Sequence, residues 1–594
     1  MKIKQAFIKF HLWRIRNISN KNFLFILSIV IGFAGGLVAA IIKNSVHFIR
    51  TLLTGGFSLE YGNYLYFIYP AIGITLSVLF MRYVLRKWVG HGIPGVLYAI
   101  SRKSGKMEPH NIYSSIVTSA FTVGFGGSVG LEGPTVATGA GIGSNIAQWL
   151  RLNYKDTILI VGAASTAAMS AIFKAPITGI VYVLEIIMLD LNLTSLMALL
   201  LASTSAVLTS YAFLGKDVIY PVNLHFELDY SLLPYFVLLA IVTGLMSLYY
   251  YNTYVAIYNF FGKLKTWYYR LPVGTIILGG LILLFPSLYG EGYESINSAL
   301  NGDYIHLFEK TFFFGYHTDF TALIIILLLV ILVKVVAMTI TFASGGVGGV
   351  FAPTLFIGSH LGLGFALFSN HFFGTHFDPV VFALLGMTGM ISGVLHGPLT
   401  GIFLIAEITS SYDMFVPLMI VSSTSFFIVR VFHKYSIYTY QLAKRGELIT
   451  HDKDKSALQM LEIENLLETN FRTVKKDYSL RQLIKEIEQS SRNLFPVLDD
   501  NGNLEGLVLL DDVRKIMFKP EYYDKVYVKD VMYKLKEQEI VDIDKDNMEE
   551  VVNKFNTTGH YNLPVVKNGK YLGFLSRANV FTSYRKLINL FSGE

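Results

Sequence analysis

Residues 126–135 read Gly-Gly-Ser-Val-Gly-Leu-Glu-Gly-Pro-Thr, and residues 345–354 read Gly-Gly-Val-Gly-Gly-Val-Phe-Ala-Pro-Thr. A second pair of matching segments follows after nearly the same interval in each case. Residues 176–180 read Pro-Ile-Thr-Gly-Ile, and residues 398–402 read Pro-Leu-Thr-Gly-Ile. The chain therefore contains an internal duplication. Glycine-rich breaks in apolar segments that recur in two halves are typical of transporters whose ion site lies where the halves meet.

The composition predicts a polytopic helical membrane protein. Of the 594 residues, 53% are hydrophobic and 15% are charged, and the mean hydropathy is +0.49. Several apolar stretches approach the ~20 residues that a helix needs to cross a bilayer; they include residues 23–42, 64–80, 232–248 and 320–332. The chain has no cysteine, which excludes disulfides, thiolate catalysis and cysteine metal sites.

The net charge of +7 indicates membrane orientation rather than a nucleic-acid partner. Six of the first 21 residues are Lys or Arg, directly before the first apolar stretch. Basic residues beside the first span favour the cytoplasmic side, so residues 1–22 are predicted to form a basic cytoplasmic N-terminus.

A change of composition after about Lys444 predicts two domains. The membrane domain is predicted at 23–446, with repeats at about 23–215 and 230–442. Charged residues become frequent in 447–594, where no spanning stretch remains and a second duplication is present. Each copy, at about 466–520 and 528–588, reads as strand, Asn-Gly turn, strand and helix, which predicts an α+β pair on the cytoplasmic side.

Three glycine-rich breaks indicate an anion site. They are Gly90-His91-Gly92-Ile93-Pro94, residues 130–134 and residues 349–353, and each carries a proline suited to a first helical turn. Helix N-termini present unpaired N–H groups and partial positive charge, so three that converge can hold an anion. The alternative is that these glycines only allow close helix packing. The duplication of two of the breaks favours the site.

Glu132, in the middle of the first glycine-rich stretch, is the candidate gate. An intramembrane carboxylate is costly and is a functional candidate by default. Among helix N-termini it can act as a tethered anion that competes with a free one, and its protonation would release it. The alternative is that Glu132 only caps its helix.

Two further pairs match between the repeats. The symmetry of Glu185 and Glu407 favours a structural role, such as bonding backbone groups at a helix break. Lys174 and His396 precede the matching prolines and are interpreted as loop residues near a surface.

These motifs resemble the CLC family of chloride channels and chloride/proton exchangers, over roughly residues 23–442. Residues 90–94 are similar to the family's GSGIP motif, residues 130–134 to GREGP and residues 349–353 to GxFxP. The resemblance implies an all-α membrane domain of two inverted-topology halves, with one pore per subunit and a homodimeric assembly. It places the gating glutamate on Glu132 and the pore tyrosine on Tyr438. The anion-binding residues implied are His91, Gly92, Ile93, Val350 and Phe351.

Three positions depart from the family pattern. His91 stands at the pore serine, so a hydroxyl donor is replaced by an imidazole that donates when neutral and is charged when protonated. Leu131 replaces the arginine of GREGP. Ile186 stands at the internal proton-transfer glutamate of the exchangers, which resembles the channels, although some exchangers also lack this acid.

The tail resembles a tandem pair of CBS domains, which often bind adenine nucleotides. The resemblance implies candidate nucleotide-binding residues at Asp512, Ser576 and Asn579, with Asn579 where Asp is usual. The alternative is a structural dimerisation module without a ligand. No metal and no required cofactor is predicted.

The leading hypothesis is a chloride channel gated by voltage and pH, in a multi-pass membrane protein with both termini cytoplasmic. A proton-coupled chloride antiporter of the same fold is the alternative. An enzyme is not expected; Ser344 and His396 give only a weak signal for an intramembrane serine protease. A cation carrier regulated by the tail would need several acids inside the spans, and the body is nearly free of them.

Overall fold

The structure is a computed structural model. It describes residues 13–14, 16–54, 58–90, 92–188, 192–216, 226–227, 229–264, 266–304, 307, 311, 315, 319–444, 458 and 461–592. The predicted anion-binding residue His91 lies outside the described residues. The chain divides into two compact units, Met1–Leu448 and Ile449–Glu594.

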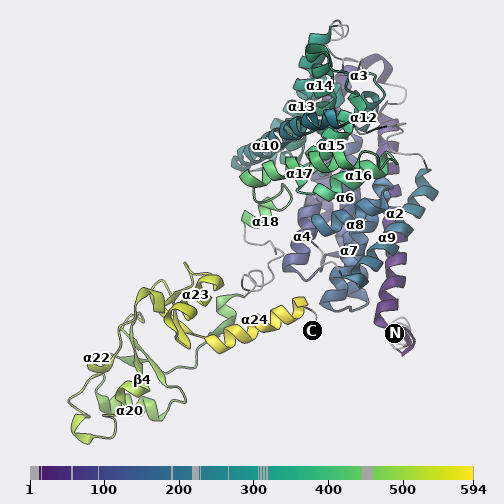
Figure 1. Ribbon diagram of the computed structural model, residues 1–594. Helices are drawn as coiled ribbons and strands as arrows, with labels where there is room; N and C mark the ends of the chain where they lie inside the picture. The colour runs from purple at the N-terminus through teal and green to yellow at the C-terminus, as the bar shows by residue number, and fades with distance from the viewer. Residues whose placement is uncertain are drawn as a thin grey trace. The chain divides into compact units, whose positions relative to one another are not determined.

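The first unit is helical (Figure 1). Within the described residues, nine helical segments are long and apolar enough to cross a membrane. They are built on α2 (Asn20–Thr54), α3 (Ser58–Leu79), α7 (Tyr154–Phe173), α9 (Leu193–Leu214), α10 (Leu233–Lys263), α11 (Trp267–Leu284), α13 (Phe320–Ala343), α14 (Phe351–Phe373) and α17 (Phe415–Phe432).

Shorter helices complete the unit. They are α4 (Ile93–Arg102), α5 (Ser114–Gly124), α6 (Glu132–Trp149), α8 (Pro176–Glu185), α12 (Tyr293–Leu300), α15 (Pro379–Leu395), α16 (Pro398–Ile408) and α18 (Tyr440–Lys444). Helices this short or this glycine-rich are tolerated at membrane depth only when neighbouring protein surrounds them.

The two halves repeat the same packing pattern. In the first half, α7 packs against α6, α8 and α9, and in the second half α15 packs against α14, α16 and α17. The helices α8 and α16 also pack against each other (Figure 1). The duplication seen in the sequence is therefore a duplication of architecture, with contacts across its centre.

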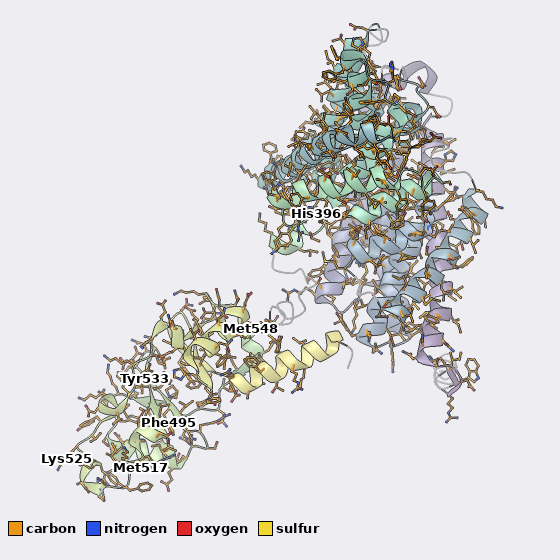
Figure 2. The ribbon with its side chains drawn as sticks, viewed as in Figure 1. His396, Phe495, Met517, Lys525, Tyr533 and Met548 are labelled. Carbon is orange, nitrogen blue, oxygen red and sulfur yellow. The ribbon has the colours of Figure 1, made fainter. Side chains whose placement is uncertain are left out.

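The matching helix breaks have matching backbones. Lys174 ends α7 with φ +56°, and His396, labelled in Figure 2, ends α15 with φ +57°. Left-handed φ values are uncommon for residues other than glycine and stop a helix abruptly. Pro176 and Pro398 then begin α8 and α16 at the position where a missing N–H costs nothing.

The second unit contains two sheets, which confirms the α+β tail. One has the strand order β1-β7-β6-β5 and the other β2-β3-β4. The bounds are β1 (Leu467–Glu468), β2 (Val474–Lys475), β3 (Leu494–Leu498), β4 (Leu504–Leu509), β5 (Val541–Asp542), β6 (Asn562–Lys567) and β7 (Lys570–Ser576). In each copy a short strand runs parallel to the first strand of an antiparallel hairpin, and both hairpins shift register at the same place.

The two hairpin turns differ. Asn568 and Gly569 both have positive φ, as a type I′ turn requires. In the first copy only Gly502 has positive φ, and the carboxylate of Asp499 accepts hydrogen bonds from the backbone of Asn501 and Asn503. The Asn-Gly signal therefore predicts the turn type of the second copy but not of the first.

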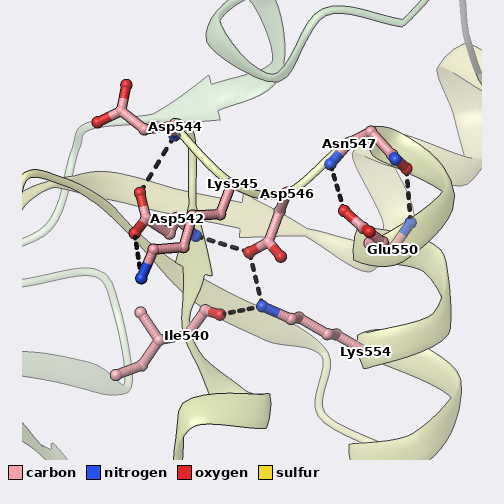
Figure 3. A network of polar contacts seen from close by, with 8 residues as sticks. All are labelled: Ile540, Asp542, Asp544, Lys545, Asp546, Asn547, Glu550 and Lys554. Carbon is pink, nitrogen blue, oxygen red and sulfur yellow. Dashed lines mark hydrogen bonds and ion pairs between the residues drawn. The ribbon is translucent and has the colours of Figure 1, made fainter.

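The tail helices are α20 (Leu480–Glu488), α21 (Leu510–Val513), α22 (Val528–Val531), α23 (Met548–Thr558) and α24 (Arg577–Ser592). Figure 3 shows how α23 begins after β5: Asn547 and Glu550 form a reciprocal capping box, and Lys554 binds the carboxylate of Asp546 at 2.6 Å. Capping residues satisfy backbone donors that the first turn leaves unpaired. The acidic side chains of this segment therefore stabilise the turn between β5 and α23.

Candidate anion site and gate

The two glycine-rich loops of the duplication pair with each other. Gly130 N–H donates to the Gly349 carbonyl at 2.8 Å, and Gly349 N–H donates to the Gly130 carbonyl at 2.7 Å. A Cβ atom on Gly349 would lie 2.8 Å from the backbone nitrogen of Gly133. Only glycine permits so close an approach, which brings the beginnings of α6 and α14 together.

A third helix begins at the same place. Gly92, with φ +82°, precedes Ile93 at the start of α4, and a Cβ atom on Gly92 would lie 2.6 Å from the Gly133 backbone. Val350 and Phe351 begin α14 and are both buried. The expected convergence of three helix N-termini is therefore present, and their N–H groups surround the beginning of α6.

Glu132 is the first residue of α6 and is only 2% exposed. Its Oε1 accepts a hydrogen bond from the hydroxyl of Tyr293 on α12. The carboxylate faces the N–H groups of Glu132 and Ala352. Its Oε2 makes no hydrogen bond, and a Cβ atom on Gly130 would lie 2.1 Å from it. The carboxylate thus lies between the helix beginnings.

Tyr438 is buried, and its hydroxyl lies near the hydroxyl of Tyr182 on α8. The ring of Tyr182 lies 6.3 Å from the ring of Phe351. Both phenol groups interact electrostatically with the carboxylate of Glu132. Tyr182, on the helix that ends just before Ile186, therefore lies beside the start of α14.

Tyr182, Tyr293 and the cations around the site were not identified from the sequence. The buried ammonium of Lys334 donates to Ser128 Oγ at 2.9 Å and to the Gly290 carbonyl at 3.2 Å, behind the first glycine-rich loop. Lys334 is the one basic residue within Phe320–Ala343, and an isolated charge in so apolar a helix is a signal that could have found it. Tyr182 could have been found from its place one helical turn before Ile186.

Glu185 and Glu407 bind across the duplication. Glu407 accepts hydrogen bonds from the N–H groups of Ile177 and Thr178 at the beginning of α8. Glu185 accepts the equivalent bonds at the beginning of α16. Each carboxylate therefore caps a helix of the other half, which confirms the structural role expected from their symmetry.

The residues of the protease hypothesis have separate surroundings. Ser344 Oγ donates to the Ile340 carbonyl at 2.6 Å and lies against Gly274. His396 packs against Phe426, with Arg430 and His433 as its charged neighbours. These contacts give no support to a serine–histidine pair.

In the tail, Ser576 ends β7 and Asn579 lies in the first turn of α24. Asp512 lies at the corresponding strand–helix junction of the first copy, in α21. Asp512 and Asn579 thus occupy matching places in the two copies. Among the described side chains, no group of three or more His, Asp or Glu residues is placed to hold a metal.

Comparisons with known proteins agree with this architecture. Residues 72–430 match the family model described as voltage gated chloride channel, and residues 463–519 and 528–586 each match the CBS domain. The chain is 28% identical over 420 residues to the H(+)/Cl(-) exchange transporter ClcA of Vibrio cholerae serotype O1, covering 67% of this chain and 84% of the relative.

Two solved structures share the fold. A slow cyanobacterial Cl-/H+ antiporter matches with a TM-score of 0.61 and 21% identity, covering 72% of this chain and 99% of the other. A eukaryotic CLC transporter matches with a TM-score of 0.62 and 17% identity, covering 94% of this chain and 99% of the other. This chain belongs to the CLC family of voltage-gated chloride channels and related anion transporters, and it carries a C-terminal pair of CBS domains.

Proposed function

We propose that this protein exchanges chloride for protons, with Glu132 as both the gate and the proton carrier. The observation that carries the proposal is the position of the Glu132 carboxylate among the beginnings of α4, α6 and α14. An ionised Glu132 occupies the place of an anion, and a protonated Glu132 loses its attraction for the N–H groups. Opening the anion site is thereby linked to uptake of a proton.

The Tyr182–Tyr438 pair supports the anion path in this proposal. These hydroxyl groups lie beside Phe351 and near Glu132, where a partly dehydrated anion needs donors. The same groups can bind the water that a proton needs to pass Ile186. The curated relative from Vibrio cholerae is named as an exchanger, which favours coupling over simple conduction.

A chloride channel gated by Glu132 is the second candidate function, and one observation favours it. Ile186, at the position of the exchangers' internal acid, is apolar and 3% exposed. Without a titratable group there, protons would have to cross by water alone. A voltage- and pH-dependent gate would then remain, without stoichiometric proton movement.

The experiment that separates the two candidates is the reversal potential of the purified protein in liposomes or a planar bilayer. A chloride gradient is set first, and a pH gradient is then imposed. An exchanger gives a reversal potential that shifts with pH at a fixed stoichiometry. A reversal potential that equals the chloride value at every pH would overturn the exchange proposal in favour of the channel.

Three further properties are proposed with this function. The protein is a homodimer with one pore in each subunit, which crosslinking in liposomes tests. The N-terminus and the CBS pair are cytoplasmic, which protease protection in oriented vesicles tests. The CBS pair binds an adenine nucleotide through Asp512, Ser576 and Asn579, and titration of the full chain with ATP, ADP and AMP tests that.

A further inference from the structure

A cavity opens beside the gate and contains an acid that the proposed mechanism does not use. Its volume is about 180 Å³, and its polar lining includes Arg50, Tyr66, Tyr289, Glu291, Tyr293 and Glu294. We call it the mouth cavity. Tyr293, which donates to Glu132, is one of its walls, so the cavity and the gate are separated by a single side chain.

Glu291 lies at the boundary between the mouth cavity and the gate. Its side chain is partly exposed to the cavity, and its carboxylate faces the charge of Glu132 and the backbone N–H of Leu131. Glu132 itself is almost completely buried, and its Oε2 is an acceptor without a hydrogen-bond partner. One carboxylate can therefore reach water, and the other has a lone pair available for a proton.

The charged groups around Glu291 come from three other elements. Lys43 and Arg50 on α2 and Lys334 on α13 are the cations that face it, and Glu132 on α6 is the anion. Lys43 is itself fixed by a 2.8 Å hydrogen bond to the Ile172 carbonyl. Two carboxylates whose charges interact are coupled, because a proton bound by one changes the proton affinity of the other.

We propose that Glu291 carries protons between the mouth cavity and Glu132. A hydronium ion in the cavity gives its proton to the Glu291 carboxylate and becomes water. The proton then passes to Glu132 Oε2, which leaves Glu291 ionised and Glu132 neutral. Tyr293 has a positioning role: its hydroxyl donates to Oε1 of Glu132, which leaves Oε2 as the oxygen that accepts the proton. The inference rests on the proposed proton-linked function of Glu132.

The first test compares Glu291→Gln with Glu294→Gln in liposomes. Glu294 lines the same cavity but is 66% exposed and paired with Arg50, so it controls for a change of cavity charge. We expect Glu291→Gln to slow chloride-driven proton uptake about 10- to 100-fold. The upper value is the lower end of the rate enhancement that a positioned proton-transfer group usually contributes. Chloride flux at low pH should stay within about twofold, because an excess of protons reaches Glu132 without the relay. Equal proton rates in the two variants would overturn the relay.

The second test uses the absence of cysteine in the chain. In Glu291→Cys the introduced thiol is the only one, and the cavity should admit small reagents to it. Iodoacetate attaches a carboxylate and should restore proton uptake. Iodoacetamide attaches a neutral amide of similar size and should not. Glu294→Cys, treated in the same way, should show neither effect. Rescue by both reagents, or by neither after complete labelling, would overturn the proposal.

The wild type shows whether the proposed function or the relay has failed. If the wild type moves no protons, proton-coupled exchange is wrong, and the relay is then judged by the rate at which chloride current rises after a step to acid pH. A slower rise in Glu291→Gln than in Glu294→Gln supports the relay in a channel as well. If the wild type is coupled and Glu291→Gln is as fast as its control, the relay alone is wrong.

Discussion

The two halves of the membrane domain share the contacts that stabilise their helix ends, and they differ in the side chains at the candidate anion site. Glu185 and Glu407 cap each other's helices with the same bonds, and Gly130 and Gly349 exchange two backbone hydrogen bonds. At the beginnings of α6 and α14, however, the equivalent residues differ: one half offers the carboxylate of Glu132, and the other offers the ring of Phe351.

The difference shows how a duplicated fold acquires a site. Symmetric pairing fixes the positions of the helix N-termini to within a hydrogen-bond length, which leaves the side chains at those ends free to diverge. In the proposed function, one side chain carries a charge that competes with the anion, and the other presents an apolar wall beside backbone N–H groups. On this view the asymmetric residues control transport and the symmetric residues control stability.

The largest expected effect follows from removal of the asymmetric charge. Glu132→Gln keeps the shape of the side chain and cannot ionise, so it imitates the protonated gate. We expect proton-coupled transport to fall at least 100-fold, in line with the loss of a positioned proton-transfer group. The pH dependence of chloride flux should also disappear, as measured by chloride efflux from liposomes between pH 4 and 8.

The matched control for this variant is Glu185→Gln, an acid of the same half that caps a helix. Its chloride flux per folded protein should keep the pH dependence of the wild type. A Glu132→Gln protein that retained that dependence would show that the gate is another residue.

The second prediction addresses the symmetric pair. Glu185→Gln and Glu407→Gln each replace an acceptor of two backbone N–H bonds and one threonine hydroxyl bond by a partly mismatched amide. We expect each to lower the free energy of unfolding by about 2–3 kcal/mol, the usual cost of losing hydrogen bonds to a charged group. Equilibrium unfolding in mixed detergent micelles measures the loss, with Glu294→Gln as the exposed control.

If the two helix caps are equivalent, Glu185→Gln and Glu407→Gln lower the free energy of unfolding by similar amounts. A large loss in one variant with none in the other would mean that the caps are not equivalent, and that one of the two carboxylates has a role beyond the structure of its half.

The recurrence of motifs in the sequence was enough to predict the broken helices and their convergence, and the assignment of Glu132 as the gate stays a prediction. It also predicted the structural role of Glu185 and Glu407, because matching residues in both halves have matching partners. Motifs report backbone features well, since a glycine or proline determines backbone geometry locally.

The residues that were missed lie outside the duplicated motifs. Tyr182 reaches the site from α8, Tyr293 from the first turn of α12, and Glu291 from the segment before α12. No local pattern reveals which distant helix a side chain will face. Lys334 and Lys43 are single charges in apolar helices, so their presence was visible in the sequence but their partners were not. Contacts between segments far apart in the chain depend on tertiary packing, which periodicity does not report.

The third prediction concerns the beginning of α4, which has no counterpart in the duplicated pair. His91→Ser restores a hydroxyl donor at the residue before Gly92. We expect relative permeability to shift toward chloride over nitrate by about 2- to 10-fold, equivalent to the ~0.5–1.5 kcal/mol net value of one hydrogen bond. Bi-ionic reversal potentials with chloride, bromide and nitrate measure the shift.

Two variants make this prediction sharper. His91→Ala removes the imidazole without adding a donor, so it should lose discrimination without gaining chloride preference. Unchanged permeability ratios in both variants would place His91 away from the anion path.

The smallest effect is expected in the tail, where the second duplication also contains an asymmetric residue. Glu539 lies in the second CBS copy, just before β5, and its carboxylate accepts hydrogen bonds from Tyr533 and from the Lys536 backbone, with His560 at 3.2 Å. Burial acts to raise the pKa of Glu539, but these bonds outweigh it and hold the pKa below its usual value near 4.5.

Because the pKa of Glu539 is lower in the folded tail than in the unfolded chain, the ionised carboxylate stabilises the fold at pH values above about 4.5. This contribution is lost as the pH falls through the lower, folded pKa. We expect the tail of the full-length protein to lose about 1 kcal/mol on acidification, near the net value of one hydrogen bond, and Glu539→Gln to lose none of it. Hydrogen exchange of the tail, corrected for the intrinsic effect of pH, measures the loss. Glu537→Gln, in the same turn but exposed, should behave as the wild type, and an acid-sensitive tail in Glu539→Gln would assign the effect to another carboxylate.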